Sequence, residues 1–247
     1  MIQAELKGKL PEVENREDVL TSNVLGLMKY LPPRKGIFKI LSELKDYSMD
    51  RNSLFDNLKS QNININDYDT VDYLFWENSP KHGEPDLILI IKSPKQHLKE
   101  LMLCIEVKYF SGKSRSGEYD QLMDYCLSLE NKDARKTYKN PKIKKFNGIF
   151  LGLIYLTYFS QYNSVREALR EIRKKGFNDY ESNFYELRWN DVTRVLSSSE
   201  SKNKYENKLI KDVVLLLKKK NLVDFEGFTN VSFSYKFDKH VFLEALK

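Results

Sequence analysis

Two acidic residues and a lysine stand at the ends of two strongly apolar segments. Glu106 and Lys108 follow the run LMLCI and are two positions apart, so in a strand their side chains project from one face while Val107 points to the other. Asp86 begins an earlier apolar run, DLILII, and antiparallel pairing of the two runs would bring it beside Glu106. Two neighbouring buried carboxylates are unfavourable unless a cation or a proton holds them.

A hard divalent cation suits such a pair of carboxylates. Magnesium prefers oxygen ligands and is commonly held by one or two carboxylates, water and substrate phosphate oxygens, and manganese could substitute for it. The metal would activate a water molecule and neutralise charge on a phosphoryl group, and Lys108 would orient that water or stabilise the transition state. E-x-K alone is common on solvated surfaces, but burial of LMLCI and the second acid favour the catalytic interpretation. We therefore expect phosphodiester hydrolysis.

The elements that must position these residues are predicted from hydrophobic patterning. Residues 14–31 have apolar residues at three- and four-residue spacing, which predicts a helix that Pro32 and Pro33 end, and residues 36–58 predict a second, more polar helix. Strands are predicted over the segments 71–79, 86–91, 101–107 and 148–158. A short link favours antiparallel pairing of the second and third strands, and a helix over 118–130 favours a parallel crossover to the fourth. The expected fold class is α/β, with a mixed central sheet flanked by helices.

Together these residues resemble a known family of nucleases. Pro85-Asp86 and Glu106-Val107-Lys108 match the motif of the PD-(D/E)XK nuclease superfamily in full. The resemblance implies a restriction-endonuclease-like core in the order αβββαβ. It also implies that Asp86, Glu106 and the backbone carbonyl of Val107 hold the metal.

Three further residues extend the resemblance. Gln121 and Tyr125 lie four positions apart on one helix face and are similar to the QxxxY element of the RecB-like branch. The superfamily usually supplies a glutamate from its first helix, and Glu17, which borders the apolar stripe, is our candidate, with Glu14 as its competitor. Either acid could instead be a first-turn residue favoured by the helix dipole.

A loop rich in glycine and basic residues follows Lys108. Lys113 and Arg115 in this loop, with Tyr125 from the following helix, are candidate nucleic-acid contacts. A solvated loop fits Lys113 and Arg115 equally well, and a partly exposed polar helix edge is the alternative for Gln121 and Tyr125. Tyr109 would either stack on bases or pack against the following helix.

Composition constrains the function less than the motif residues do. The 247 residues carry a net charge of +6, which favours polyanionic partners only slightly. Cys104 and Cys126 lie among apolar residues and are expected in the core, the three histidines lack the spacing of zinc ligands, and no phosphate-binding glycine loop occurs. No apolar run is long enough to cross a bilayer, so we expect a soluble, cytoplasmic protein with no membrane contact. We expect one domain over 1–247, with its core at about 14–158 and a C-terminal α/β extension at about 159–247.

The leading functional hypothesis is a magnesium-dependent deoxyribonuclease. The resemblance implies a setting in restriction, repair or defence against foreign DNA, including antiviral defence. The alternative is a non-catalytic or partner-dependent nucleic-acid-binding subunit with the same fold, and a purely structural partner protein is a third hypothesis. A homodimer or a partner protein is compatible with the absence of a recognisable target-reading domain.

Overall fold

The computed structural model describes residues 7, 17–109, 115–116, 119–159, 162–177 and 180–224. The helices of eight or more residues are α2 (Glu17–Met28), α5 (Gln121–Glu130), α8 (Tyr162–Lys174), α9 (Trp189–Ser197) and α10 (Lys204–Lys219). The shorter helices are α3 (Ile37–Leu41), α4 (Leu54–Ser60), α6 (Lys132–Arg135) and α7 (Pro141–Lys144), with 3-10 turns at Pro33–Lys35, Ile65–Asp67 and Tyr180–Asn183. The strands are β1 (Lys45–Asp46), β2 (Thr70–Phe75), β3 (Leu87–Lys92), β4 (Leu101–Val107), β5 (Arg115–Ser116), β6 (Tyr119–Asp120), β7 (Ile149–Thr157) and β8 (Phe184–Arg188).

Six of the strands form one mixed sheet in the order β1-β8-β7-β4-β3-β2. Strands β2, β3 and β4 pair antiparallel, whereas β7 pairs parallel with both β4 and β8. The expected mixed α/β fold and the expected order αβββαβ are confirmed, with α2, β2, β3, β4, α5 and β7 as its members. Strands β5 and β6 form a separate two-stranded ribbon.

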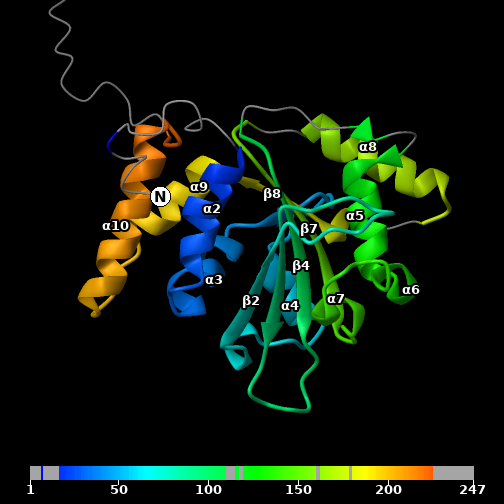
Figure 1. The fold of residues 1–247 in the computed structure, drawn as a ribbon, viewed down its shortest axis with the longest axis horizontal. Coiled ribbons are helices and arrows are strands. Elements are labelled where there is room, and N and C mark those ends of the chain that lie inside the picture. Colours follow the sequence, from blue (N-terminus) through cyan, green and yellow to red (C-terminus); the bar gives the residue numbers. More distant parts are fainter. Residues whose placement is uncertain are drawn as a thin grey trace, which may run out of the picture.

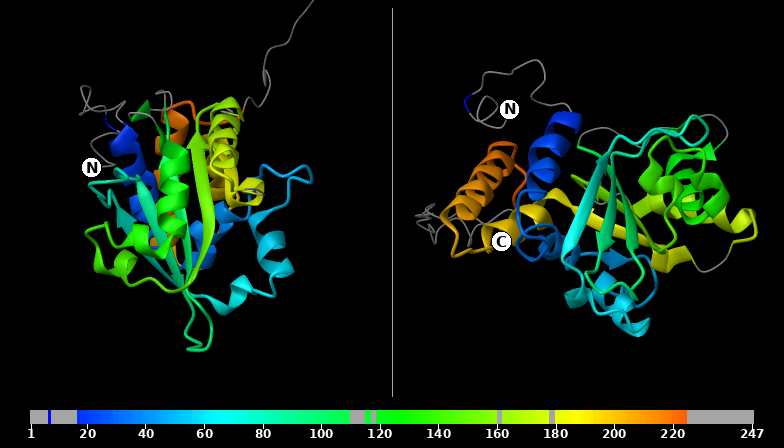
Figure 2. Two further views of the ribbon diagram at one scale, coloured as in Figure 1. Left: turned by 90° about the vertical axis from the view of Figure 1, so that its right-hand side faces the viewer. Right: turned by 60° about the horizontal axis from the view of Figure 1, so that its bottom comes forward.

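Helices cover both faces of this sheet, because the central strands are apolar on both of their alternating sides. Every residue of β4 is buried, and so are all residues of β3 except the last. Figure 1 shows α2, α3, α9 and α10 on one side of the sheet and α5, α6 and α8 on the other, and the right-hand view of Figure 2 shows the same separation. Cys104 and Cys126 are both buried free thiols, as expected.

Two hydrophobic cores result from this arrangement. The first core packs α2, α3, α4, α9 and α10 against one face of the sheet, and the second packs α5, α7 and α8 against the other. Along β4, Leu103 and Ile105 enter the first core, and Met102 and Cys104 enter the second. The next even-numbered residue, Glu106, therefore faces the side of the second core.

A register shift in β7 decides which residue lies beside Glu106. Met102 pairs with Phe150, but Leu103 pairs with Gly152, so β7 contains one extra residue at this point. Gly152 has φ +132°, and a Cβ there would overlap the backbone carbonyl of Asn183. Beyond the shift, Glu106 pairs with Tyr155.

The segment 36–58 differs from the single polar helix expected. It contains the short helix α3, whose residues Ile37, Phe38, Ile40 and Leu41 are buried, then β1, and then α4. The break occurs because β1 adds to the edge of the sheet beside β8, and Ser53 then starts α4 with a capping box to Asp56.

The described residues that follow β7 belong to the same sheet and the same two cores. Strand β8 pairs with β7, and α9 and α10 pack together against the side of the sheet that α2 and α3 cover. The helix α9 was not expected from the sequence. Near the C-terminus the sequence has a further apolar alternation, over residues 231–237, which lies outside the described residues. Among the helices that the structure describes, none combines the length and the apolar character needed to span a membrane.

Candidate active site at the end of β4

Strands β3 and β4 bring Asp86 and Glu106 together at one end of the sheet. The pairing of Leu87 with Ile105 puts Asp86, one residue before β3, opposite Glu106. The backbone amide of Val107 donates a hydrogen bond of 2.8 Å to Oδ2 of Asp86. Asp86 is 8% exposed and Glu106 is 2% exposed, so two carboxyl groups lie next to each other in a nearly dry environment.

Lys108 lies on the same face as Glu106 and contacts two acids. Its Nζ is 2.8 Å from Oε1 of Glu106 and 3.2 Å from Oε1 of Glu17. The lysine itself is only 7% exposed, and its backbone amide donates to the carbonyl oxygen of Leu156 in β7. The strand register and the two acids together fix the position of the ammonium group.

Glu17 reaches the site from the first turn of α2. In Figure 1 the β3–β4 hairpin lies at the bottom of the sheet, so the end of β4 lies at the top, where α2 also begins. The second oxygen of Glu17, Oε2, accepts a hydrogen bond of 2.9 Å from the backbone amide of Tyr109. The structure thus brings Glu17 to Lys108, whereas Glu14 lies outside the described residues. The role of Glu17 stays a prediction.

Burial and mutual repulsion control the protonation of the two buried acids. Burial raises the pKa of Glu106 to about 8, and the charge of Asp86 adds to the effect while Lys108 opposes it. Burial likewise raises the pKa of Asp86 to about 6, against the opposing Val107 amide and Lys108 ammonium. Burial favours neutral Lys108, but the carboxyl groups of Glu106, Glu17 and Asp86 outweigh it and raise the pKa of the lysine. The lysine therefore stays charged.

One oxygen in this cluster has no partner. Oε2 of Glu106 is buried and makes no hydrogen bond with any described residue. An unsatisfied buried carboxylate oxygen is costly, and a cation or a water molecule would satisfy it. Within the described part of the chain, no group of three or more His, Cys, Asp and Glu side chains converges to hold a metal ion. Among the described residues, Asp86 and Glu106 are the two carboxyl groups that lie next to each other at this end of the sheet.

Helix α5 supports the loop that leads into Asp86. The side-chain amide of Gln121 donates a hydrogen bond of 2.9 Å to the Tyr125 hydroxyl, and the ring of Tyr125 lies against Gly83, which has φ +85°. Next to it, Nδ1 of His82 is 3.0 Å from Oδ1 of Asp124. These contacts hold residues 82–86 against α5 and so help to place Asp86.

The candidate nucleic-acid contacts and Tyr109 are only partly covered by the described residues. Tyr125 is 3% exposed, so the structure does not bring its ring to a surface, and its contact with nucleic acid stays a prediction. Lys113 lies outside the described residues. Arg115 lies in β5, but its side chain lies outside them too. Tyr109 does not pack against the following helix: it is buried in the first core, edge-on to Tyr158.

Sequence patterns missed Tyr155. Its hydroxyl is buried and has no partner among the described residues, and it lies beside Glu106 in the register of β4 and β7. Burial raises its pKa to about 12, with Lys108 opposing and Glu106 contributing. A tyrosine inside the apolar run GIFLGLIYLTY was a weak signal, because only the register shift at Gly152 turns it toward Glu106.

Comparison with known proteins adds little to this site. No family model matches the chain, and no curated protein matches it. Among solved structures, the MspJI restriction endonuclease in complex with a 27-mer oligonucleotide matches with 11% sequence identity and a TM-score of 0.31. The match covers 85% of this chain and 38% of that chain, so this chain spans well under half the length of that one. Similarity at this level supports no inference about activity, which has to be argued from the residues of this chain.

Proposed function

We propose that this protein is a metal-dependent nuclease that hydrolyses phosphodiester bonds of DNA, with Asp86, Glu106 and Lys108 at the centre of its active site. The observation that carries the proposal is the burial of two carboxyl groups and a lysine side by side at the end of a central strand. Burying such a cluster costs free energy that a structural role would not require, because apolar residues of similar size pack there at lower cost. Perturbed pKa values at a buried cluster are typical of catalytic sites.

Asp86, Glu106 and the backbone carbonyl of Val107 are the groups that would hold the metal. Oε2 of Glu106, which has no partner among the described residues, fits this role, because a cation would satisfy it and would allow both acids to ionise. When bound, Mg²⁺ or Mn²⁺ would neutralise charge on the scissile phosphate and make a nearby water molecule more acidic.

Lys108 would donate from Nζ to the attacking water or to the scissile phosphate. Glu17 acts as a positioning residue, since its carboxylate holds the lysine charged and also fixes the backbone at Tyr109. Gln121 and Tyr125 would position the Asp86 loop, in agreement with the proposed RecB-like QxxxY element. Glu17, Gln121 and Tyr125 would thus hold the catalytic acids and the lysine in position.

A basic surface on α8 supports a nucleic-acid substrate. Arg166, Arg170 and Arg173 recur at helical spacing and line a cavity of about 690 Å³, and Arg173 is ion-paired with Glu181. Arginines on one helix face suit contacts with phosphate groups along a nucleic-acid backbone. We therefore assign non-specific backbone contacts to this surface.

The test is cleavage of linear, circular and single-stranded DNA with Mg²⁺ or Mn²⁺. Wild-type protein should cut at least one form in a metal-dependent way, and Lys108→Ala should lose this activity. Asp86→Asn is a sharper second variant, because its side chain still accepts the hydrogen bond from Val107 but has lost its charge. Lys59→Ala, an exposed lysine on α4, should cut like wild type. Metal-dependent cutting that Lys108→Ala retains would disprove the assignment.

A partner-dependent, binding-only subunit is the second candidate function. It is favoured by the small number of candidate metal ligands. Among the described residues no group of three or more acidic, histidine or cysteine side chains converges to hold a metal ion. In that case the wild-type protein, Asp86→Asn and Lys108→Ala would all bind DNA with the same affinity, and none of the three would cleave it. The proposed setting in restriction, repair or defence, and the proposed homodimer or partner subunit, apply to either function.

A further inference from the structure

A line of aromatic rings runs from the candidate active site to the protein surface. Tyr109, which follows Lys108, is buried, and its ring centroid lies 6.3 Å from that of Tyr158 in an edge-on contact. Tyr158 in turn contacts Phe159 edge-on, with centroids 4.2 Å apart. Phe159 is 66% exposed, so the line ends in an aromatic ring that is open to solvent.

The exposed ring borders a small hollow of about 200 Å³. Tyr158, Phe159, Arg188 and Asn190 line it, together with the turn that follows α10. The hollow is fixed relative to the active site through the sheet. Lys108 donates its backbone amide to Leu156, three residues before Phe159, and Thr157 pairs with Arg188 in the register of β7 and β8.

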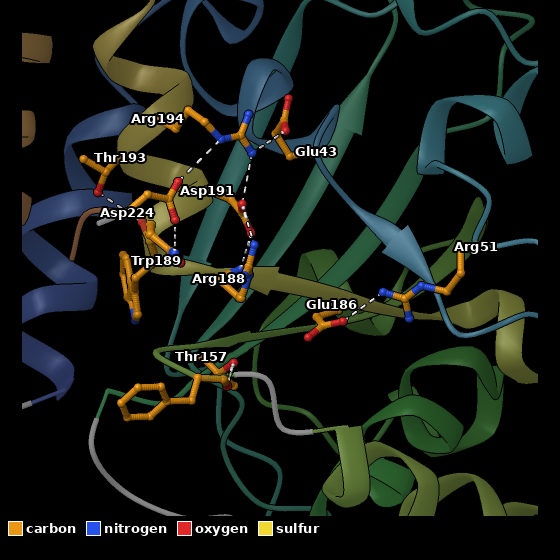
Figure 3. A network of polar contacts seen from close by, with 12 residues as sticks. Glu43, Arg51, Thr157, Glu186, Arg188, Trp189, Asp191, Thr193, Arg194 and Asp224 are labelled. Atoms are coloured by element: carbon orange, nitrogen blue, oxygen red, sulfur yellow. Dashed lines mark hydrogen bonds and ion pairs between the residues drawn. The ribbon is translucent and has the colours of Figure 1, made fainter. Parts of the chain in front are cut away.

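Arg188 is held in place by an ion-pair network, as Figure 3 shows. Its Nε and Nη2 lie 3.1 and 3.3 Å from the two carboxylate oxygens of Asp191, and Asp191 also accepts a hydrogen bond of 3.0 Å from Arg194. Arg194 reaches Glu43 at 3.0 Å. The guanidinium charge of Arg188 is therefore offset locally, which makes the hollow better suited to a flat, neutral group than to a phosphate.

We propose that this hollow binds one unpaired nucleobase of a single-stranded or frayed DNA substrate, with the ring of Phe159 as its stacking surface. The inference rests on the proposed nuclease function and names the form of its substrate. Aromatic side chains beside a nucleic-acid path bind bases by stacking, which tolerates any sequence. Pockets that enclose drug-sized ligands have volumes of roughly 300–1,000 Å³, so the smaller hollow suits a single base.

Asn190 adds a polar edge to the hollow. Its Nδ2 donates a hydrogen bond of 2.5 Å to Asp224, while its Oδ1 is buried and has no partner among the described residues. A small rotation of this amide would offer a hydrogen-bond acceptor to the edge of a stacked base. The hollow therefore combines an aromatic stacking face with an amide, two of the groups by which proteins bind unpaired bases.

The test is binding by the metal-free full chain in EDTA, which prevents cleavage. Three probes are compared by fluorescence anisotropy: a single-stranded DNA of mixed sequence, the same strand with abasic sites, and the corresponding duplex. The variant is Phe159→Ala. Its matched control is Phe177→Ala, because Phe177 is also exposed (45%) and also contacts a tyrosine edge-on, Tyr180, with centroids 6.0 Å apart.

We expect Phe159→Ala to weaken binding of the single strand roughly tenfold, as loss of one stacked base implies. The abasic strand should already bind weakly to wild type and should not respond to the substitution, and Phe177→Ala should bind every probe as wild type does. Equal binding of the single strand by Phe159→Ala and wild type would overturn the inference, as would failure of wild type to prefer the strand that carries bases. The cleavage assay tests the proposed function separately, because it compares wild type with Lys108→Ala and Asp86→Asn, in which Phe159 is unchanged.

Discussion

The ammonium group of Lys108 lies 2.8 Å from Oε1 of Glu106, and both side chains are almost completely buried. The pair matters for both folding and the proposed catalysis, because the protonation state of each side chain depends on the charge of the other. Removing either partner leaves a buried charge or forces a change of protonation.

Lys108→Ala should destabilise the protein as well as inactivate it. Glu106 loses its partner, so we expect a loss of about 1–3 kcal/mol in the free energy of unfolding, measured by urea denaturation. The double variant Lys108→Ala/Glu106→Gln should recover part of this stability, because the neutral glutamine does not need the charge of the lysine, but it should not recover cleavage. A double variant that is no more stable than Lys108→Ala would contradict the proposed pairing.

The stability of the metal-free protein should fall as the pH rises from about 5 to about 8. Burial raises the pKa values of Asp86 to about 6 and of Glu106 to about 8, so the folded protein holds protons that the unfolded chain has already released. The stabilising contribution of these protons is complete at low pH and is lost as the pH passes through the raised pKa values. Thermal unfolding in EDTA across this range measures the effect, and Glu106→Gln should flatten the slope.

Added Mg²⁺ should reverse this trend. A cation held by the ionised acids would stabilise the folded state more at pH 8 than at pH 5, so the shift in Tm on adding Mg²⁺ should grow with pH. A shift that is the same at both pH values, or that Glu106→Gln leaves unchanged, would argue against metal binding by these acids.

Glu17→Gln should lower cleavage with little loss of stability. The amide can still accept from the Tyr109 backbone, but it loses the charge that holds Lys108. We expect about a tenfold fall in kcat, with a pH profile whose basic limb moves to lower pH as the lysine becomes easier to deprotonate. Asp18→Asn is the matched control, because Asp18 is the adjacent acid in α2, is exposed and acts on Asp86 only through its charge, so it should have a much smaller effect than Glu17→Gln. An identical effect of the two substitutions would remove the special role of Glu17.

Tyr155→Phe tests the buried hydroxyl beside Glu106. The hydroxyl is buried and has no partner within the described part of the chain, so its removal should leave stability unchanged or raise it by up to about 1 kcal/mol. If the hydroxyl contacts a water molecule or a phosphate oxygen in the working enzyme, cleavage should fall at the same time, and we expect this combination. Unchanged cleavage would make Tyr155 a packing residue only.

Arg166→Ala/Arg170→Ala tests the basic surface of α8. Each lost phosphate contact should lower the dependence of log Kd on log salt concentration by about one unit. Affinity for duplex and single-stranded DNA should weaken to a similar extent, because the contacts are to the backbone. Lys59→Ala serves as the control for the loss of a positive charge elsewhere, and an equal change in that variant would exclude a specific surface on α8.

The sequence alone predicted the central strands and which acids and lysine of the candidate site would lie together at their ends. The runs DLILII and LMLCIEV are apolar on both alternating faces, which specifies buried strands, and their short connection specifies antiparallel pairing. The two-residue period then put Glu106 and Lys108 on one face and Asp86 opposite them. These are local rules of chain geometry, and they need no knowledge of distant contacts.

The tertiary structure decided what lies around those residues. Tyr155 faces Glu106 because β7 carries one extra residue where Gly152 crosses close to Asn183, a contact that no local pattern encodes. Glu17 reaches Lys108 because α2 packs on the first core with its first turn at the end of β4, and Arg188 lies by Phe159 because β8 pairs with β7. Such contacts join residues far apart in the chain, and their geometry follows from packing of the whole sheet rather than from the period of any one segment.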